Sequence, residues 1–306
     1  MELTYLQYFL RVAELGSINR AALDLNLSQP ALSRNIAALE HEVGTALFLR
    51  RRDGVKLTEA GRLFADRARP LLGQFALIKE EVGQTAAGQV TLGLPQAWQN
   101  VFTIAFLGQF VQRHPAVALK IYDGVSNILR DYLLSGLVDI CIMPFEPLSP
   151  LGYTQTPLVR EPMIALGDAK AGFRPAEEVP LSALENSWII MPGRTNVLRQ
   201  QVEQAFMRRG MRMRMQVEPS TQDLCIECAR NGLGIGIVPA SCLQGYANTD
   251  NLSWAPLKGI CATWSLYENE ARAHSEAVRA ARQLIIDALA GKPLWFGAER
   301  VPAVSV

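Results

Sequence analysis

Hydrogen-bonding side chains gather in one short stretch near the N-terminus, residues 28–34. Gln29, Ser33 and Arg34 are residue types that bond to base edges, and small apolar neighbours contact thymine methyl groups. The major groove of DNA admits one helix, so these side chains would act together if they shared a helix face. The alternative is an ordinary solvated helix face.

A basic patch follows this stretch. Its members, opposed by three acids, are Arg50, Arg51, Arg52, Lys56, Arg62, Arg67 and Arg69. Arg51, Arg52 and Lys56 could neutralise backbone phosphates, which positions a protein on DNA without specifying a sequence. The net charge of +1 does not itself favour nucleic acid, but this uneven distribution does. A solubilising hairpin is the alternative.

Metal and catalytic chemistry find little support in the sequence. Cys225 and Cys228 form a lone C-x-x-C, which needs a second pair to bind zinc and on a helix more often marks one packed face. His41, His114 and His274 belong to different predicted elements. Since the motifs of hydrolases, phosphate-binding loops and zinc proteases are missing, we predict no enzyme, cofactor or metal. Redox control through cysteine stays open as an alternative.

Composition indicates a modular globular protein. A chain of 306 residues exceeds what one core usually serves, and 49% of its residues are hydrophobic. We expect a cytoplasmic protein without membrane contact, because the sequence shows no export signal and no apolar run long enough to cross a bilayer. The five cysteines are odd in number and scattered through the C-terminal half, which favours reduced thiols.

Two helices are predicted before the hydrogen-bonding stretch. Apolar residues recur at helical spacing over residues 3–15, and Gly16 follows as a terminator. Ser17 can cap a second helix that ends at Asn26. The close spacing of these signals predicts two short helices that meet at a tight turn.

A third helix is predicted from a cap at Ser28 through Glu42. Pro30 falls in its first turn, where the missing N–H would have no intrahelical partner. The residues expected to face the core are Leu27, Ala31, Leu32, Ile36 and Leu39. Those on the opposite side are Gln29, Pro30, Ser33, Arg34 and Ala37. Residues 48–57 then predict two short strands around an Asp-Gly turn, a wing with basic residues at its tip.

These elements carry an ordered motif that resembles the signature of the LysR-type transcriptional regulators. It comprises Ala21-Ala22, Leu27-Ser28-Gln29-Pro30-Ala31-Leu32-Ser33, Ile36, Leu39-Glu40, Gly44, Leu47-Phe48 and Leu57-Thr58-Glu59-Ala60-Gly61. The match covers residues 2 to about 72, and the remainder fits the family by pattern alone. The resemblance implies double-stranded operator DNA with dyad symmetry as partner. It also implies recognition-helix positions for Ser28, Gln29, Pro30, Ser33 and Arg34, and wing positions for Arg51 and Arg52.

A linker helix is predicted after the wing. Its apolar residues alternate in spacings of four and three, the seam of a short coiled coil, at Phe64, Ala68, Leu71, Phe75, Ile78 and Val82. We therefore expect a dimer through this helix, and the resemblance implies a tetramer and RNA polymerase as a further partner to consider. Pro70 predicts a kink near residues 66–70, because proline removes a helical hydrogen bond.

The C-terminal two thirds predict an α/β fold with mostly parallel sheets. Strands are expected near residues 89–94, 117–122, 138–143, 160–166, 187–191, 213–218, 235–238 and 262–268, with helices between them. The predicted domains are 1–58 for DNA binding, 59–87 for the linker, 88–291 for effector binding and 292–306 for a tail. The resemblance implies two lobes like type 2 periplasmic binding proteins. Lobe I would take 89–160 and 267–291, and lobe II 161–266.

Three loops that follow strands are candidates for the effector site, since ligands bind beyond the carboxyl ends of strands and at helix N-termini. The resemblance implies that residues 95–98, 124–127 and 193–196 line one cleft. The candidate effector residues are Gln96, Trp98, Ser126, Asn127, Phe145, Thr195, Asn196 and Gln222. Ser126 and Thr195 could instead be helix caps, and Trp98 could pack within a lobe. Arg194 favours an organic acid as the small-molecule effector.

Overall fold

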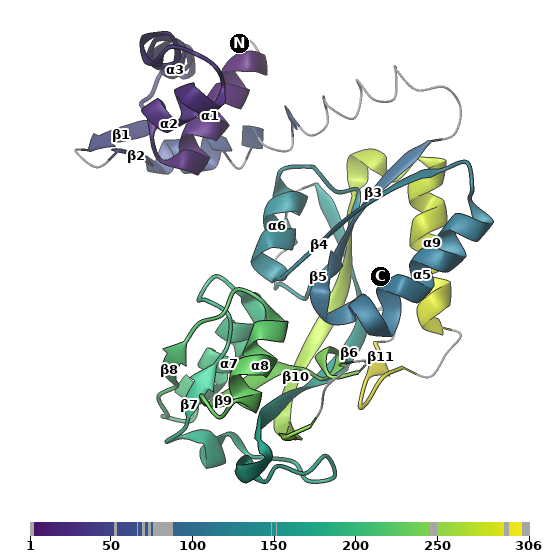
Figure 1. Cartoon of the computed structure of the whole chain (residues 1–306). Coiled ribbons are helices and arrows are strands. Elements are labelled where there is room, and N and C mark those ends of the chain that lie inside the picture. The colour runs from purple at the N-terminus through teal and green to yellow at the C-terminus, as the bar shows by residue number, and fades with distance from the viewer. Residues whose placement is uncertain are drawn as a thin grey trace. The chain divides into compact units, whose positions relative to one another are not determined.

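The computed structural model describes residues 3–51, 54–65, 67–68, 71–72, 75, 88–147, 149–150, 152–244, 246, 250–290 and 294–301. The chain divides into two compact units, and the main division falls after Gln84 (Figure 1). Each unit is treated by itself below. Within these ranges, no helix is both long and apolar enough to cross a bilayer.

The first unit consists of three helices and a hairpin. They are α1 (Leu3–Leu15), α2 (Ile18–Asp24), α3 (Gln29–Val43), β1 (Phe48–Arg51) and β2 (Gly54–Leu57). The predicted caps are confirmed, because the side chains of Ser17 and Ser28 accept hydrogen bonds from the N–H groups of Arg20 and Ala31. Gly44 ends α3 at a φ of 78°, a left-handed conformation that glycine adopts without strain.

Part of the predicted coiled-coil seam belongs to the core of this first unit. Residues 59–65 are helical, and the ring of Phe64 packs edge-on against Phe9, with 5.2 Å between ring centroids. Ala68 is buried in the same cluster. Phe64 and Ala68 therefore pack within one chain, and their expected role in a seam with a second chain stays a prediction.

The next two seam positions have a different environment. Leu71 and Phe75 are 53% and 47% exposed, so their apolar surfaces are available to a partner. Pro70 and the kink predicted there lie outside the described residues, as do Ile78 and Val82.

The second unit contains a mixed sheet covered by helices. Its strands are β3 (Gln89–Pro95), β4 (Ala118–Gly124), β5 (Ile140–Pro144), β6 (Tyr153–Asp168), β7 (Trp188–Ile190), β8 (Arg214–Val217), β9 (Ile235–Pro239), β10 (Leu252–Asn269) and β11 (Glu299–Arg300). Its α-helices are α5 (Ile104–Arg113), α6 (Ser126–Leu134), α7 (Val197–Met207), α8 (Gln222–Arg230) and α9 (Glu276–Ala290). The strand order is β4-β3-β5-β10-β6-β9-β7-β8, and β11 pairs with β6.

Two long antiparallel strands connect the two lobes of this unit. β6 and β10 pair from Tyr153 opposite Asn269 to Asp168 opposite Leu252. In Figure 1 they run from the lobe with β3, β4, β5, α5, α6 and α9 to the lobe with β7, β8, β9, α7 and α8. The predicted lobe boundaries, between residues 160 and 161 and between residues 266 and 267, thus lie within continuous strands.

The predicted, mostly parallel sheet is wrong in one respect. β3 is parallel to β4 and β5, and β7 is parallel to β8 and β9, as the alternation of strands and helices indicates. β10 and β6 run antiparallel to each other and to their neighbours β5 and β9. The sheet is mixed because the chain returns between lobes through these strands.

The C-terminal segment is part of the second unit. A tail was predicted for residues 292–306 because the sequence there shows no periodicity. Instead, Trp295 is only 6% exposed, and Glu299 and Arg300 pair with Arg160 and Val159 of β6. One buried ring and one short strand hold this segment, and neither leaves a repeating pattern in the sequence.

Candidate functional site

The predicted DNA-reading face of α3 is exposed on the first unit. Gln29, Pro30 and Arg34 are exposed at the start of the helix, with Ser28 as its cap and Ser33 half-buried. The opposite face is buried in the core through Leu32, Ile36 and Leu39. The amphipathic pattern of α3 therefore directs the hydrogen-bonding residue types outward.

Two sets of contacts hold α3 and the wing in place. Glu40 on α3 accepts hydrogen bonds through Oε1 from the N–H groups of Leu47 at 2.7 Å and Phe48 at 2.9 Å. The N–H of Val55 on β2 donates to the carbonyl of Gly16, at the end of α1, at 3.0 Å. The wing is thus joined by hydrogen bonds to both α1 and α3.

The tip of the wing requires glycine. Gly54 has a φ of 136°, and a Cβ there would lie 2.4 Å from the carbonyl oxygen of Gly16. Gly54 pairs with Arg51, the last residue of β1. The backbone therefore places Arg51 at the tip, whereas its side chain and the whole of Arg52 lie outside the described residues.

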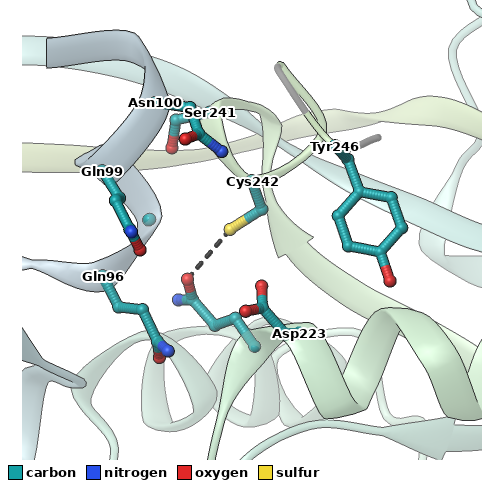
Figure 2. Close-up of a pocket in the computed structure, with 9 residues that line it drawn as sticks. Gln96, Gln99, Asn100, Asp223, Ser241, Cys242 and Tyr246 are labelled. Atoms are coloured by element: carbon teal, nitrogen blue, oxygen red, sulfur yellow. Dashed lines mark hydrogen bonds between the residues drawn. The ribbon is translucent and has the colours of Figure 1, made fainter. Parts of the chain in front are cut away.

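The second unit contains a cavity of about 190 Å³ between its lobes, named here the polar cavity (Figure 2). Its lining consists of Gln96, Ala97, Gln99, Asn100, Gln222, Asp223, Ser241, Cys242 and Tyr246. The lining comes from the chain that follows β3 in one lobe, and from the start of α8 and the chain that follows β9 in the other. Of the predicted effector residues, Gln96 and Gln222 lie here.

Hydrogen bonds within the protein order the polar cavity. The thiol of Cys242 donates to Oε1 of Gln222 at 2.9 Å, as the dashed line in Figure 2 shows. Ser241 donates from its N–H at 2.7 Å and from its hydroxyl at 2.9 Å to the carboxylate of Glu161 behind the cavity wall. The first turn of α8 is capped by Thr221, whose hydroxyl accepts from the N–H of Leu224.

Glu161 on β6 is a fully buried carboxylate with donors on both oxygens. Besides Ser241, the indole N–H groups of Trp264 and Trp295 donate to it. Burial raises the pKa of Glu161, and the surrounding donors partly oppose that shift because they favour the ionised form. The carboxylate therefore joins three segments distant in sequence, which are β10, the segment after β9 and the C-terminal segment.

Trp98 does not line the polar cavity, although it was predicted as an effector residue. It is fully buried, and its ring packs against Trp264 and Trp295 with centroid distances of 5.5 Å and 5.0 Å. The structure thus favours the alternative of packing within the domain.

Ser126 and Asn196 meet at the start of α7. The hydroxyl of Ser126, on α6 of one lobe, accepts a hydrogen bond from the N–H of Val197, on α7 of the other lobe, at 3.1 Å. Asn196 caps the same helix by accepting from the N–H of Arg199 at 3.1 Å. Both residues act as helix caps here. Asn127, beside Ser126, is half-buried and lines neither the polar cavity nor the two further cavities described below.

A second cavity of about 340 Å³ takes in two more predicted residues, Phe145 and Thr195. Its other lining residues are Arg130, Glu146, Pro147, Val197, Gln200, Gln201 and Gln204. Arg130 is paired with Glu146 at 3.1 Å. Phe145 also borders a third, more open cavity beside Arg208 and Cys261. Arg194 lines none of these cavities and is 79% exposed at its side chain.

Most residues of the polar cavity, including Ser241 and Cys242, were not predicted from the sequence. A signal for these two residues was present, because Pro239-Ala240-Ser241 follows a strand into a short helical turn as Pro95-Gln96-Ala97 does. The same rule that selected the loop after β3 would have selected the loop after β9.

Burial disfavours the thiolate form at several of the cysteines. All five are free, and no group of ligands that could hold a metal occurs among the described residues. Cys225 on α8 is buried, and burial raises its pKa to about 12 and that of Cys242 well above its ordinary value. Since the thiolate is the reactive form, these environments disfavour reaction at both thiols. Cys225 and Cys228 pack on one face of α8, as the helical spacing predicts.

A winged helix-turn-helix together with a two-lobed α/β unit that holds a cavity between its lobes defines a ligand-responsive DNA-binding regulator. The family models agree with this class. Residues 3–62 match the bacterial regulatory helix-turn-helix protein of the lysR family, and residues 83–290 match the LysR substrate binding domain. The chain belongs to the LysR family of bacterial transcriptional regulators.

Individual relatives support the same assignment. The chain is 31% identical to the HTH-type transcriptional regulator BudR of Raoultella terrigena, over 88% of this chain and 96% of that protein. It is 29% identical to the nitrogen assimilation regulatory protein nac of Klebsiella aerogenes, over 82% of each. Among solved structures, CbnR aligns at a TM-score of 0.62 and 19% identity, over 94% of this chain and 99% of that chain. A full-length OxyR variant of Pseudomonas aeruginosa aligns at 0.61 and 22%, over 100% and 99%. These structures show the shared fold.

Proposed function

We propose that this regulator reads a dyad-symmetric operator through the start of α3, and that a small molecule in the polar cavity changes how it does so. The observation that supports DNA reading is the exposed position of Gln29 and Arg34 at the start of α3. Ser28 caps this helix, and contacts with the core and the wing hold it in place. Gln29, Ser33 and Arg34 bond to base edges, while Ser28 and Pro30 approach the DNA backbone. Arg51 and Arg52 neutralise phosphates beside the groove.

A dimer through the linker helix supplies the symmetry that such an operator requires. The exposed apolar surfaces of Leu71 and Phe75 support this pairing, and two dimers would form a tetramer. One of the similar structures is CbnR with its target DNA. We place the protein in the bacterial cytoplasm, with operator DNA and RNA polymerase as its partners, and we assign it no catalytic reaction.

The effector acts by linkage. A ligand that binds one arrangement of the lobes better than another shifts the population toward that arrangement, which changes the spacing of the DNA-binding units in the oligomer. The polar cavity supports this role because both lobes supply its lining. The expectation of an organic acid depended on Arg194. Because Arg194 lines none of the described cavities, no cavity contact supports that expectation.

Footprinting on the upstream region of its own gene tests the DNA-reading face. The double variant Gln29→Ala with Arg34→Ala should lose operator protection while it keeps the oligomer and the fold, measured by gel filtration and circular dichroism. Arg212→Ala removes an exposed arginine from the second unit and should protect the operator as the wild type does. Unchanged protection by the double variant would contradict the proposal.

The alternative of redox control has its own assay. Alkylation of thiols before and after peroxide treatment, followed by peptide mapping, should show unchanged labelling of Cys225 and Cys242, because both pKa values are raised. Loss of labelling at either cysteine after peroxide would favour the redox alternative.

A further inference from the structure

The polar cavity is lined by amides and one acid, with no base among its lining residues. Four of its side chains are the amides Gln96, Gln99, Asn100 and Gln222. Its charged lining residue is Asp223, which is exposed and has no ion-pair partner among the described residues. The nearby guanidinium of Arg230 is paired with Glu227, to which the hydroxyl of Tyr246 also donates. The electrostatic balance therefore disfavours an anion.

Two of the N–H groups at the helix starts beside the cavity are already occupied. Helix starts bind anions because their first N–H groups lack partners. Here the N–H of Ser241 donates to the buried carboxylate of Glu161, and the N–H of Leu224 donates to Thr221. A carboxylate ligand would find these two donors satisfied, and it would be repelled by the negative charge of Asp223.

The cavity still offers hydrogen-bonding groups that suit a neutral or a cationic ligand. Oε1 of Gln222 accepts from the thiol of Cys242, which fixes the orientation of this amide. Its Nε2 has no hydrogen-bond partner among the described residues, although the side chain is only 7% exposed. Gln222 can therefore donate to a ligand carbonyl, while Asp223 can accept from a ligand N–H or ammonium group.

We propose that the polar cavity binds a small molecule that carries N–H donors and no negative charge, an amide or an amine. Asp223 accepts from its nitrogen, and the amide of Gln222 donates to its polar oxygen where one is present. The volume of about 190 Å³ lies below the range of roughly 300–1,000 Å³ that is usual for ligand pockets, so the ligand is compact. This inference rests on the proposed role of the cavity as the effector site.

Three probes of one chain length separate the ligand classes. The probes are butyramide, butylammonium and butyrate. Each is titrated into the full-length protein at constant ionic strength, and its binding is measured by saturation-transfer NMR. We expect saturable binding of the amide and the ammonium at millimolar concentration, and binding of butyrate at least tenfold weaker. Equal or tighter binding of butyrate would overturn the inference, and so would the lack of saturable binding by both nitrogen probes.

Two variants assign the binding to this cavity. Asp223→Asn should weaken butylammonium about two- to fivefold, the range of an exposed ion pair, and leave butyramide unchanged. Gln222→Met removes the side-chain donors at similar volume and should weaken butyramide more than butylammonium. Asp131→Asn, on the exposed part of α6, is the matched control and should change neither. Unchanged affinities in both cavity variants would show that the probes bind elsewhere and would overturn the inference.

Footprints recorded with the same probes keep the two proposals distinguishable. If a nitrogen probe binds with an unaltered footprint, the ligand class stands and the effector role of the cavity fails. If butyrate binds better and alters the footprint, the effector role stands and the ligand class fails.

Discussion

The N–H of Val197 at the start of α7 donates a hydrogen bond to the hydroxyl of Ser126 at the start of α6, over 3.1 Å. The two helices belong to different lobes, so part of the capping of α7 comes from the opposite lobe. Asn196 supplies the remaining cap from within α7's own lobe. The stability of this helix start therefore depends on the arrangement of the lobes.

Replacement of Ser126 by alanine should loosen that arrangement. We expect the free energy of unfolding to fall by about 1 kcal/mol, the usual net value of one hydrogen bond. Amide hydrogen exchange should accelerate at Val197, whereas the N–H of Arg199 stays protected by Asn196. Ser182→Ala, at an exposed position in a short helical turn, is the control and should leave both rates unchanged. Equal exchange at Val197 in variant and wild type would contradict an interlobe cap.

The adjacent aromatic residues Trp295 and Phe296 should differ strongly in their contribution to stability. Trp295 is buried against Trp98 and donates to Glu161, so Trp295→Ala should cost about 3–5 kcal/mol in chemical denaturation. Phe296 is exposed and makes an edge contact with Trp254, so Phe296→Ala should cost about 1 kcal/mol. Similar losses in both variants would refute the ordered packing of the C-terminal segment.

Stability should depend on pH through Glu161. Because burial raises the pKa of this carboxyl in the folded state, the folded chain binds the proton more tightly than the unfolded chain. The free energy of unfolding should therefore fall as the pH rises above the ordinary value of 4.5 and through the raised pKa. Glu161→Gln should flatten this decline in denaturation curves recorded across the pH range.

The Glu161→Gln variant should keep part of the decline of stability with rising pH. Burial also raises the pKa of Glu268, which keeps its own contribution. The exposed Glu185→Gln serves as the control and should retain the wild-type slope. A Glu161→Gln curve with that same slope would disprove the assignment.

Glu40 should be required to hold the wing against α3. Glu40→Ala leaves the N–H groups of Leu47 and Phe48 without their acceptor, at an expected cost of about 1–3 kcal/mol. Operator affinity should fall with it, because the wing loses its fixed position. Glu40→Gln keeps an oxygen at the same place and should retain most of the stability and the affinity. An alanine variant as stable as the glutamine variant would argue against this brace.

The N-terminal helices could be predicted because their signals are local. Ser17 and Ser28 bond to N–H groups three residues away, and the apolar spacing within α1 and α3 depends on one helix at a time. The exposed position of Gln29 and Arg34 follows from the same periodicity. Phe64 shows the limit of such reasoning, since periodicity identifies an apolar face and leaves open whether it packs within the chain or against another chain.

Less of the effector-binding half could be predicted, because its site depends on contacts between distant parts of the chain. The alternation of strands and helices predicted an α/β unit, and two of eight candidate residues, Gln96 and Gln222, line the polar cavity. Ser126 caps a helix of the other lobe because two helix starts meet, which no local pattern records. Asn196 caps its own helix three residues away, a signal as local as those of Ser17 and Ser28.

The DNA-reading half is therefore determined by the sequence itself, through the caps and apolar spacing of α3, which carries Gln29, Ser33 and Arg34. Only the tertiary structure determined which residues meet around the polar cavity and behind its wall. Glu161 bonds to Ser241 across 80 residues and to Trp295 across 134. The physical reason is range, because helix caps form between near neighbours, whereas a buried carboxylate collects donors that the folded chain brings together.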